Sequence, residues 1–297
     1  MTQTFTHTGW IIYPRYVARH GDNAFGWLAD EAAAVGIDLH VLFAEELTVG
    51  YGHGTVPAFW HRGEAVTRLP DFAIVRTYDT VLSRALERAG VPLINSSASM
   101  ELCKNKMLTH ELLAAAGIPT PQTLYAPEGE YDYRHVAGVL GSERFVVKRI
   151  DGAKGEDVFL IDNEEGMRQA VAQCKGHCLC QQFIASSSGR DVRVWVIGDR
   201  VAGAVLRYSE TSFRSNFSQG GQVAPFELSP HAAQLAVRSA RLLGVAFSGI
   251  DLLFGEDDHF IVNEINGNAG FRTLSQLGRP NPIPAELFAY IRDSLLH

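Results

Sequence analysis

Two carboxylates and one amide near residue 260 could together bind a divalent metal ion. Asp251 lies in the apolar run 250–254, and Glu264 and Asn266 lie in or directly after a second apolar run, 260–265. Because strand side chains alternate between faces, Glu264 and Asn266 point the same way, and a turn between the runs brings Asp251 close to them. Carboxylate and amide oxygens are the ligands that Mg²⁺ or Mn²⁺ prefers, so the sequence predicts a metal-binding β-hairpin.

A solvated position is the alternative for these three polar side chains, since most aspartates and glutamates in strands face water. Their neighbours in both runs are apolar, however. A carboxylate pair in apolar surroundings needs a cation or a shared proton, which favours the metal site.

Lys148 lies in a strand-like run, on the same face as Val146 and Ile150. A lysine on an apolar face is unusual unless it pairs with an anion, although a lysine that protects an edge strand is an equal alternative. The glycine-rich turn 151–155 follows directly, and its backbone N–H groups could converge on phosphate oxygens beside Lys154. On its own, this turn is more typical of a plain hairpin.

More cationic residues and a second glycine-rich loop lie elsewhere in the chain. Arg214 and Asn216 stand in that loop, which ends at the glycine pair 220–221. A cationic set beside an acidic metal site is what a magnesium nucleotide requires, because the phosphates bridge the two. The other members of the set are Lys106, in a predicted helix, and Arg193 and Arg207, on a predicted hairpin.

Strands and helices alternate over about the first hundred residues, which predicts an open parallel α/β sheet. Ligands of such sheets lie beyond the carboxyl ends of the strands, where Arg76 stands, so we expect Arg76 to contact a substrate. No phosphate-binding glycine fingerprint follows the first strand, which argues against a dinucleotide site. The expected strands are 9–13, 37–43, 72–75 and 91–94, and the expected helices are 23–35 and 80–89.

A segment rich in glycine and proline, 117–121, marks the clearest boundary in the chain. One helix is predicted before it, over 99–116, and a loop after it, over 125–134. A small α+β unit follows, and a helix over 230–243, with Ser229 as its N-cap, precedes the metal hairpin. The remaining predicted elements are strands 145–150, 158–161 and 178–184, helix 164–173, and a hairpin of 191–197 with 200–208.

The composition is that of an ordinary soluble globular protein, with 297 residues, 46% hydrophobic and 20% charged. The net charge of −7 gives no general attraction to nucleic acid or to an anionic membrane, and no apolar run is long enough to span a bilayer. The N-terminus lacks the features of a signal peptide, so a cytoplasmic location is expected. Cys174, Cys178 and Cys180 do not have a usual zinc spacing, so these and Cys103 are expected to be reduced thiols.

The order of these pieces resembles the ATP-grasp superfamily, and within it the RimK-like carboxylate–amine ligases. The resemblance runs from about 95 to 270. Its most specific parts are the segments FRSN at 213–216, GG at 220–221, GID at 249–251 and NEIN at 263–266. It implies an ATP-grasp fold of mixed α/β and α+β type in three parts. These are an N-terminal open parallel α/β (pre-ATP-grasp) domain at 1–97, a helical linker and central lid subdomain at 98–184, and a C-terminal subdomain with the metal site at 185–297.

The resemblance also implies roles for the matching residues, with ATP held between the central and C-terminal units. The glycine loop acts as a flexible lid, and Asp251, Glu264 and Asn266 hold two Mg²⁺ ions. Arg214, which faces the reacting carboxylate, forms the catalytic set with Arg207 and Lys154. The expected nucleotide contacts are Lys106 and Lys148 at the phosphates, Gly152 and Gly155 in the lid, Gln181, Gln182, Phe183 and Ile184 at the adenine hinge, Asp191 at the ribose, Arg207 and Asn216 at the terminal phosphates, and Arg193 elsewhere along the cofactor.

Two positions depart from the family pattern. The family often has glutamate where Gln182 stands, so one hinge or ribose contact is expected to differ. After Asn266, relatives commonly read Ala-Ser-Pro-Gly or Ser-Ser-Pro-Gly, whereas this chain reads GNAG and then FR. That segment lies beside the acceptor site in the family, so Gly270 and Arg272 are expected to select the substrate, and the familiar protein or glutamate substrates are not assumed.

The chemistry of such ligases accounts for the cationic and acidic groups. A carboxylate attacks the γ-phosphate of ATP, and the resulting acyl phosphate is captured by an amine to form an amide. Bringing these anions together requires positioning and charge neutralisation, not a nucleophilic side chain. We therefore expect an ATP-dependent ligase that joins the carboxylate of an amino acid to an amine. The substrates are expected to be small molecules, with a peptide or a carrier protein as an alternative acceptor. A homo-oligomer is a possible assembly.

Three alternatives stay open at this point. The same acyl-phosphate route could load an amino acid onto a carrier protein, or the chain could be a nucleotide-binding regulator without turnover. Retention of all three metal-type ligands argues against the regulator. A two-lobed protein that only binds small molecules is the third alternative, and it has no need for the paired carboxylates.

Overall fold

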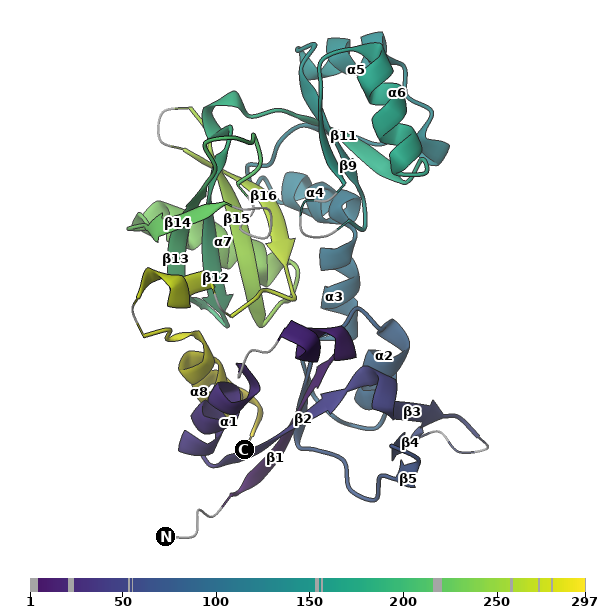
Figure 1. Cartoon of the computed structure of the whole chain (residues 1–297), viewed down its shortest axis with the longest axis vertical. Helices are drawn as coiled ribbons and strands as arrows, with labels where there is room; N and C mark the ends of the chain where they lie inside the picture. Colours follow the sequence, from purple (N-terminus) through teal and green to yellow (C-terminus); the bar gives the residue numbers. More distant parts are fainter. Residues whose placement is uncertain are drawn as a thin grey trace.

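Three units make up the part of the chain that the structure, a computed structural model, describes (Figure 1). An N-terminal unit is built on a parallel sheet, a middle unit on a small antiparallel sheet, and a C-terminal unit on the largest sheet. No helix among the described residues is long and apolar enough to cross a bilayer. The described residues are 5–20, 24–52, 54, 56–152, 155, 157–215, 221–256, 259–271, 273–278 and 280–296.

The N-terminal sheet is parallel, as the alternating pattern of strands and helices predicts, with strand order β2-β1-β6-β7. A small antiparallel sheet, which the sequence analysis does not predict, follows β2. The elements of this unit are β1 (His7–Tyr13), α1 (Ala24–Ala34), β2 (Ile37–Phe43), β3 (Leu47–Gly50), β4 (Ala58–His61), β5 (Glu64–Ala65), β6 (Phe72–Val75), α2 (Thr80–Arg88) and β7 (Leu93–Ile94).

The single helix predicted over 99–116 is wrong, because the chain forms two helices there, α3 (Ser97–Lys104) and α4 (Lys106–Ala115). Asn105 separates them with an extended backbone, at φ −93° and ψ 96°. Its side chain accepts hydrogen bonds from the backbone N–H groups of Met107 and Leu108 at 3.1 and 3.2 Å. An asparagine that bonds the backbone ahead of it ends one helix and caps the next.

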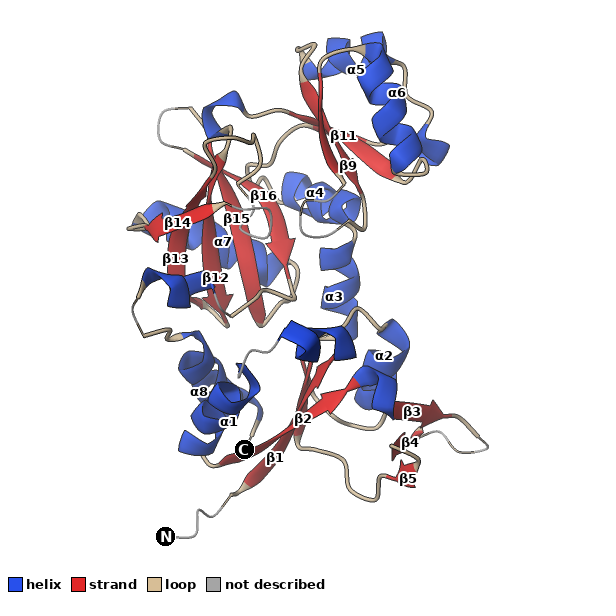
Figure 2. Cartoon of the chain, in the orientation of Figure 1, coloured by secondary structure: helices blue, strands red, loops and turns tan. Residues whose placement is uncertain are grey.

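The middle unit is an antiparallel sheet of order β10-β9-β11-β8, with helices α5 and α6 on one side (Figure 2). Helix α5 was not predicted, and it begins inside the stretch 125–134 that the sequence analysis assigns to a loop. Asp132 caps it by accepting from the backbone N–H of His135 at 2.7 Å. The elements are β8 (Thr123–Leu124), α5 (Tyr133–Leu140), β9 (Phe145–Arg149), β10 (Val158–Ile161), α6 (Glu164–Gln173) and β11 (Cys178–Gln182).

The C-terminal sheet has the order β14-β13-β12-β15-β16, and its strands pair in an antiparallel manner. The predicted hairpin that carries Asp251, Glu264 and Asn266 is confirmed, and its strands are β15 and β16. Helix α7 lies behind the sheet in Figure 1, and its predicted N-cap, Ser229, accepts from the backbone N–H of Ala232 at 3.2 Å. The elements are β12 (Arg190–Ile197), β13 (Arg200–Tyr208), β14 (Gln222–Pro225), α7 (Pro230–Leu242), β15 (Phe247–Phe254) and β16 (Phe260–Asn266).

The two faces of β12 differ in chemistry. Val192 and Val194 pack in the core under α7, whereas Asp191 and Arg193 lie on the other face. Further along that other face, Trp195 joins a core that includes residues of the N-terminal sheet and of α8 (Ile283–Leu295). Strand β12 therefore carries polar groups at one end and anchors the N-terminal unit at the other. Because one core runs through the first and last units, the division predicted at 97 and 184 stays a prediction.

Candidate active site

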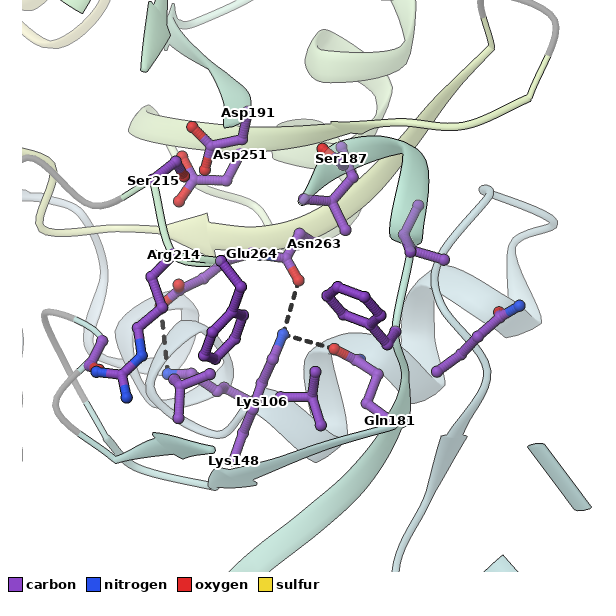
Figure 3. A pocket seen from close by; sticks show the side chains of 18 of the residues that line it. Lys106, Lys148, Gln181, Ser187, Asp191, Arg214, Ser215, Asp251, Asn263 and Glu264 are labelled. Carbon is purple, nitrogen blue, oxygen red and sulfur yellow. Dashed lines mark hydrogen bonds and ion pairs between the residues drawn. The ribbon is translucent and has the colours of Figure 1, made fainter. Parts of the chain in front are cut away.

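A cavity that is open to solvent lies between the middle and C-terminal sheets (Figure 3). Lys148 on β9 and Gln181 on β11 face Asp251 on β15 and Glu264 on β16 across it. Lys106, at the first turn of α4, joins this set. The structure thus brings cationic and acidic groups from separate parts of the sequence into one space.

The side of the cavity that carries Asp251 and Glu264, here called the acidic wall, contains a β-bulge. Asp251 lies opposite Glu264 in the strand register, whereas the next pair is Leu252 with Val262. Asn263 is therefore the extra residue of the bulge, and it lines the cavity together with Glu264. A regular strand would turn one of these two neighbouring side chains away from the cavity.

Two arginines neutralise the buried carboxylate of Asp251. Arg193, its partner in the register of β12, donates from Nε to Oδ1 and from Nη2 to Oδ2, the latter at 2.8 Å. Arg207 Nη2 lies 2.9 Å from the same Oδ2 and also pairs with Asp191, at 2.7 Å through Nε and 2.5 Å through Nη2. Burial opposes ionisation of Asp251, but the two guanidinium groups outweigh it and lower the pKa of this carboxyl.

Neither Arg193 nor Arg207 is among the described residues that line the cavity. Their predicted contacts with the nucleotide therefore stay predictions, and the observed contacts place them behind the acidic wall. Arg193 reaches Asp251 across Gly249, where a Cβ atom would come within 3.0 Å of the arginine side chain. Glycine at this position thus leaves the space that the ion pair needs.

The donor set fits a hard divalent cation. A carboxylate has about four lone-pair positions. Arg193 and Arg207 together occupy three of these positions on Asp251, so one lone pair on Oδ1 is left for a metal ion. Glu264 contacts Lys106 Nζ at 3.2 Å, and its side chain is 27% exposed. Asn266 lies opposite Gly249 in the register, on the strand next to that of Asp251. It is not among the described residues that line the cavity. Oxygen donors with acceptor capacity to spare are the ligands that Mg²⁺ prefers.

Lys148 bridges the two walls of the cavity (Figure 3). Its Nζ donates to Gln181 Oε1 at 2.5 Å and to Asn263 Oδ1 at 2.7 Å. Burial lowers the pKa of Lys148 to about 8, although the nearby Glu264 favours the charged form. As the sequence predicts, Lys148 shares a face with Val146, and both line the cavity.

The glycine loop is held by cations at both of its described ends. Lys106 Nζ donates to the carbonyl of Gly152 at 2.5 Å, and Arg214 Nη1 donates to the carbonyl of Gly155 at 3.0 Å. Burial lowers the pKa of Arg214. Both glycines line the cavity, and the role of their loop as a lid stays a prediction.

The four residues predicted as the adenine hinge all line the cavity. The Phe183 ring meets the Phe213 ring edge-on at 6.3 Å, which gives this end of the cavity an apolar, aromatic surface. Asp191, the predicted ribose contact, lines the cavity too, but its carboxylate is already paired with Arg207. The hinge residues are Gln181, Gln182, Phe183 and Ile184.

Arg76 and Gly270, the predicted substrate residues, lie at the interface between the N-terminal and C-terminal units. Arg76 Nη2 donates to the carbonyl of Ala269 at 2.7 Å, and its guanidinium lies 4.8 Å from the centre of the Phe271 ring. The carbonyl of Gly270 accepts from Trp195 Nε1 at 3.0 Å. Neither residue is among the described lining of the cavity, so their role in substrate binding stays a prediction.

Three predicted site residues, Lys154, Asn216 and Arg272, lie outside the described residues. Two further candidates, Asn263 and His110, were missed by the sequence analysis. Asn263 stands in the segment NEIN, but the bulge that turns it into the cavity is not visible in the sequence. His110 is a lone histidine in a predicted helix and carries no local signal of function.

We expect Lys148→Met to weaken the binding of Mg-ATP at least about tenfold, because the cavity loses a buried ammonium with charge-assisted hydrogen bonds. In the wild type, affinity should fall above about pH 8, since only the protonated lysine attracts phosphate and its pKa is about 8. Calorimetry across this range, with the exposed Lys104→Met as control, checks both statements. Unchanged affinity in Lys148→Met would make Lys148 a structural lysine.

Comparisons with known proteins identify the family of the chain. The family model described as the RimK-like ATP-grasp domain matches residues 103–291, which is more than half of the chain. A probable alpha-L-glutamate ligase of Xanthomonas campestris pv. campestris (strain 8004) is 35% identical over 202 residues, covering 67% of this chain and 69% of the relative.

Solved structures share the fold over nearly the whole chain. The RimK domain ATP-grasp protein of Sphaerobacter thermophilus DSM 20745 aligns with a TM-score of 0.72 and 20% identity, covering 96% of this chain and 99% of that one. The ATP-grasp ligase PsnB, in complex with a precursor peptide and AMPPNP, aligns with a TM-score of 0.70 and 22% identity, covering 97% and 99%. The fold, the cavity and the match over 103–291 lead to one conclusion: the chain belongs to the RimK-like ATP-grasp family.

Proposed function

We propose that this protein joins the carboxylate of an amino acid, free or within a peptide, to an amine and releases ADP and phosphate. As a RimK-like ATP-grasp ligase, the chain is an ATP-dependent enzyme that forms C–N bonds between carboxylates and amines, with ATP and Mg²⁺ as cofactors. The proposal concerns its substrates and the residues that act on them. The single observation that carries it is the cavity in which Lys106, Lys148 and Arg214 face Asp251 and Glu264.

The opposed charges suit phosphoryl transfer to a carboxylate. ATP and the carboxylate are both anions, so they must be held together while charge moves onto the leaving ADP. Lys106 and Lys148 line the cavity and would neutralise phosphate oxygens, and Arg214 lines it too, with its Nη1 donating to the carbonyl of Gly155 in the glycine loop. No covalent intermediate with the protein is needed, since the acyl phosphate is itself the activated species.

We assign two Mg²⁺ ions to Asp251, Glu264 and Asn266. When bound, Mg²⁺ would supply positive charge that offsets the charge of the phosphates. Glu264 would offer two carboxylate oxygens to the ions, whereas Asp251 would offer the one lone pair outside its arginine contacts. Titration with Mn²⁺ in the presence of a non-hydrolysable ATP analogue counts the ions, and a stoichiometry of one would reduce the assignment to a single site.

The relatives guide the choice of substrates. Curated relatives are named probable alpha-L-glutamate ligases, and PsnB was solved with a precursor peptide. In this chain, Arg76 stacks on Phe271 and holds Ala269, within the segment that departs from the family pattern. We therefore propose an amino-acid carboxylate as the activated group and a small amine or a peptide amine as acceptor, without assuming glutamate.

A screen of amino acids against amines, read by release of ADP and phosphate, tests this function. We expect ADP release to depend on both an acyl donor and an amine, and the product mass to equal the two substrates less one water. The proposal would be contradicted if no donor made ADP release depend on an amine. It would also be contradicted if the products contained no new C–N bond.

We expect Arg214→Lys to lower kcat by about tenfold to a hundredfold for every substrate pair, with little change in stability. Lysine keeps the charge but loses the planar fork that can meet two oxygens at once. The effect should be on kcat because these contacts form as the acyl phosphate develops. Steady-state kinetics with Arg168→Lys, an exposed arginine on α6, as control checks it. A kcat/KM equal to wild type would remove Arg214 from the acyl site.

A further inference from the structure

A continuous chain of hydrogen bonds runs behind the cavity from β16 to Lys148. Thr120 Oγ1 donates to the carbonyl of Val262 at 3.0 Å and lies 2.6 Å from His110 Nδ1. His110 Nε2 lies 2.8 Å from the amide nitrogen of Gln181. Gln181 Oε1 in turn accepts from Lys148 Nζ at 2.5 Å, the last link, which Figure 3 shows.

The two ends of this chain determine where every hydrogen lies. A carbonyl can only accept and an ammonium can only donate. Because Thr120 donates to Val262, its oxygen accepts from His110, so Nδ1 of the imidazole carries the hydrogen. Nε2 is then an acceptor for the amide NH₂ of Gln181, and the amide oxygen faces Lys148.

A side branch supports the same orientation of Gln181. Its amide nitrogen also lies 2.8 Å from Thr123 Oγ1, whose hydroxyl donates to the carbonyl of Pro121 at 2.8 Å. Both N–H groups of the amide are therefore used by acceptors. A flipped amide would turn two N–H groups toward Lys148, which has only donors to offer.

His110 is suited to this task only as a neutral ring. It is 3% exposed, and burial lowers its pKa to about 3, with the ammonium groups of Lys148 and Lys106 acting in the same direction. A protonated imidazole would donate from both nitrogens and so oppose the amide NH₂ of Gln181. The surroundings thus keep the acceptor lone pair on Nε2.

We propose that His110 is a positioning residue for ATP binding, which orients the Gln181 amide so that its oxygen holds the Lys148 ammonium at the phosphate end of the cavity. Gln181 and Lys148 belong to the middle sheet, whereas Val262 and Asn263 belong to β16. The location of the ammonium is therefore set by both walls of the cavity together. This inference rests on the proposed contact of Lys148 with phosphate.

The first test compares His110→Leu with His110→Gln by calorimetry of Mg-ATP binding. We expect His110→Leu to weaken binding about tenfold, since the amide of Gln181 loses its acceptor. His110→Gln offers a carbonyl oxygen in a similar place and should restore affinity to within about threefold of wild type. Weak binding should appear as a raised KM for ATP, with a much smaller change in KM for the amine. Equal affinity in His110→Leu and wild type would overturn the inference.

The control is Thr109→Val on the same helix. Its hydroxyl is also buried and donates to the carbonyl of Leu102 at 2.9 Å, away from Gln181. We expect this variant to lose thermal stability without losing affinity for ATP. If Thr109→Val weakened ATP binding as much as His110→Leu, the effect of His110 would be general destabilisation.

A double-mutant cycle shows whether His110 acts through Gln181. If it does, His110→Leu with Gln181→Leu should bind Mg-ATP no more weakly than Gln181→Leu alone. Additive losses would overturn the inference. If His110→Leu does not fold, the nearly isosteric Thr120→Val replaces it. We expect Thr120→Val to bind Mg-ATP about threefold more weakly than wild type, and we expect no such difference when Gln181→Leu is already present.

The ¹⁵N spectrum of the imidazole, assigned with His110→Gln, gives a readout that does not depend on ATP. We expect a neutral ring with hydrogen on Nδ1 at pH 7, and a ring with hydrogen on Nε2 or on both nitrogens would overturn the inference. Two variants distinguish the role of His110 from the phosphate contact of Lys148. Unchanged affinity in Lys148→Met overturns the proposed phosphate contact, whereas a weakened Lys148→Met beside an unaffected His110→Leu overturns the role of His110 alone.

Discussion

Glu264→Gln should lower turnover by at least about a hundredfold while leaving the thermal melt close to that of the wild type. The substitution removes one anionic ligand where the phosphate charge must be neutralised, but it keeps the size and one oxygen of the side chain. Glu264 is partly exposed, and its described ion pair is with Lys106 at 3.2 Å, so the fold does not depend on its charge. ADP formation and the thermal melt should be measured on the same preparation.

Glu101→Gln is the matched control, since that glutamate forms an exposed ion pair with Arg84 on the surface. It should keep the activity and the melt of the wild type. If Glu264→Gln retained activity within about tenfold of wild type, a change in barrier of only about 1.4 kcal/mol, Glu264 would not be a metal ligand.

Arg207→Met should lower the free energy of unfolding by about 3–5 kcal/mol, because it leaves a buried carboxylate without its partner. Arg207 is 5% exposed and pairs with both Asp191 and Asp251, which are buried as well. Asp251 keeps Arg193, so the main cost falls on Asp191. A loss of this size corresponds to a fall in melting temperature of roughly 10 °C.

Two variants test the cause of this loss. Arg241→Met breaks an ion pair with Asp199 in which both side chains are more than half exposed, and it should cost less than about 1 kcal/mol. Adding Asp191→Leu to Arg207→Met removes the unpaired charge and should recover part of the stability. An Arg207→Met protein as stable as Arg241→Met would show that the network contributes little.

The stability that Asp251 contributes depends on pH with a definite sign. Burial opposes ionisation of Asp251, but the arginines lower its pKa below that of an unfolded aspartate. Its contribution is therefore fully present above the unfolded pKa of about 3.9 and is lost as the pH falls through the lower folded pKa. The part of the stability difference between wild type and Arg207→Met that comes from Asp251 should therefore shrink in acid.

Local patterns in the sequence were enough to predict most of the elements and a site for a magnesium nucleotide, whereas the ligase activity was implied by the resemblance to the family. The alternating strands and helices predicted the parallel sheet, and the paired apolar runs around Asp251 and Glu264 predicted the hairpin that carries them. These predictions depend on side-chain periodicity and turn residues, which act over a few positions. Lys148 was placed on the same face as Val146 for the same reason, through its spacing along the strand, and both line the cavity.

Local signals also misled in two places. Residues 99–116 have a helical pattern throughout, and the break at Asn105 comes from a side chain that competes with the helix for backbone N–H groups. Helix α5 begins in a polar stretch that resembles a loop, and its apolar residues Val136 and Leu140 gain their stability by packing in the core of the middle unit. Tertiary burial overrides weak local preference in such segments.

The contacts that define the site depend on partners far apart in the chain. The bulge that turns Asn263 into the cavity is a property of the register between β15 and β16, and it has no marker in either strand. Likewise, the pairing of Asp251 with Arg193 and Arg207 follows from the alignment of three strands, although each residue could be named as charged and functional from the sequence. His110 acquires its role only because α4 brings it to Gln181, 71 residues away. Periodicity specifies which face a side chain occupies, but the folded sheet specifies which group it meets there.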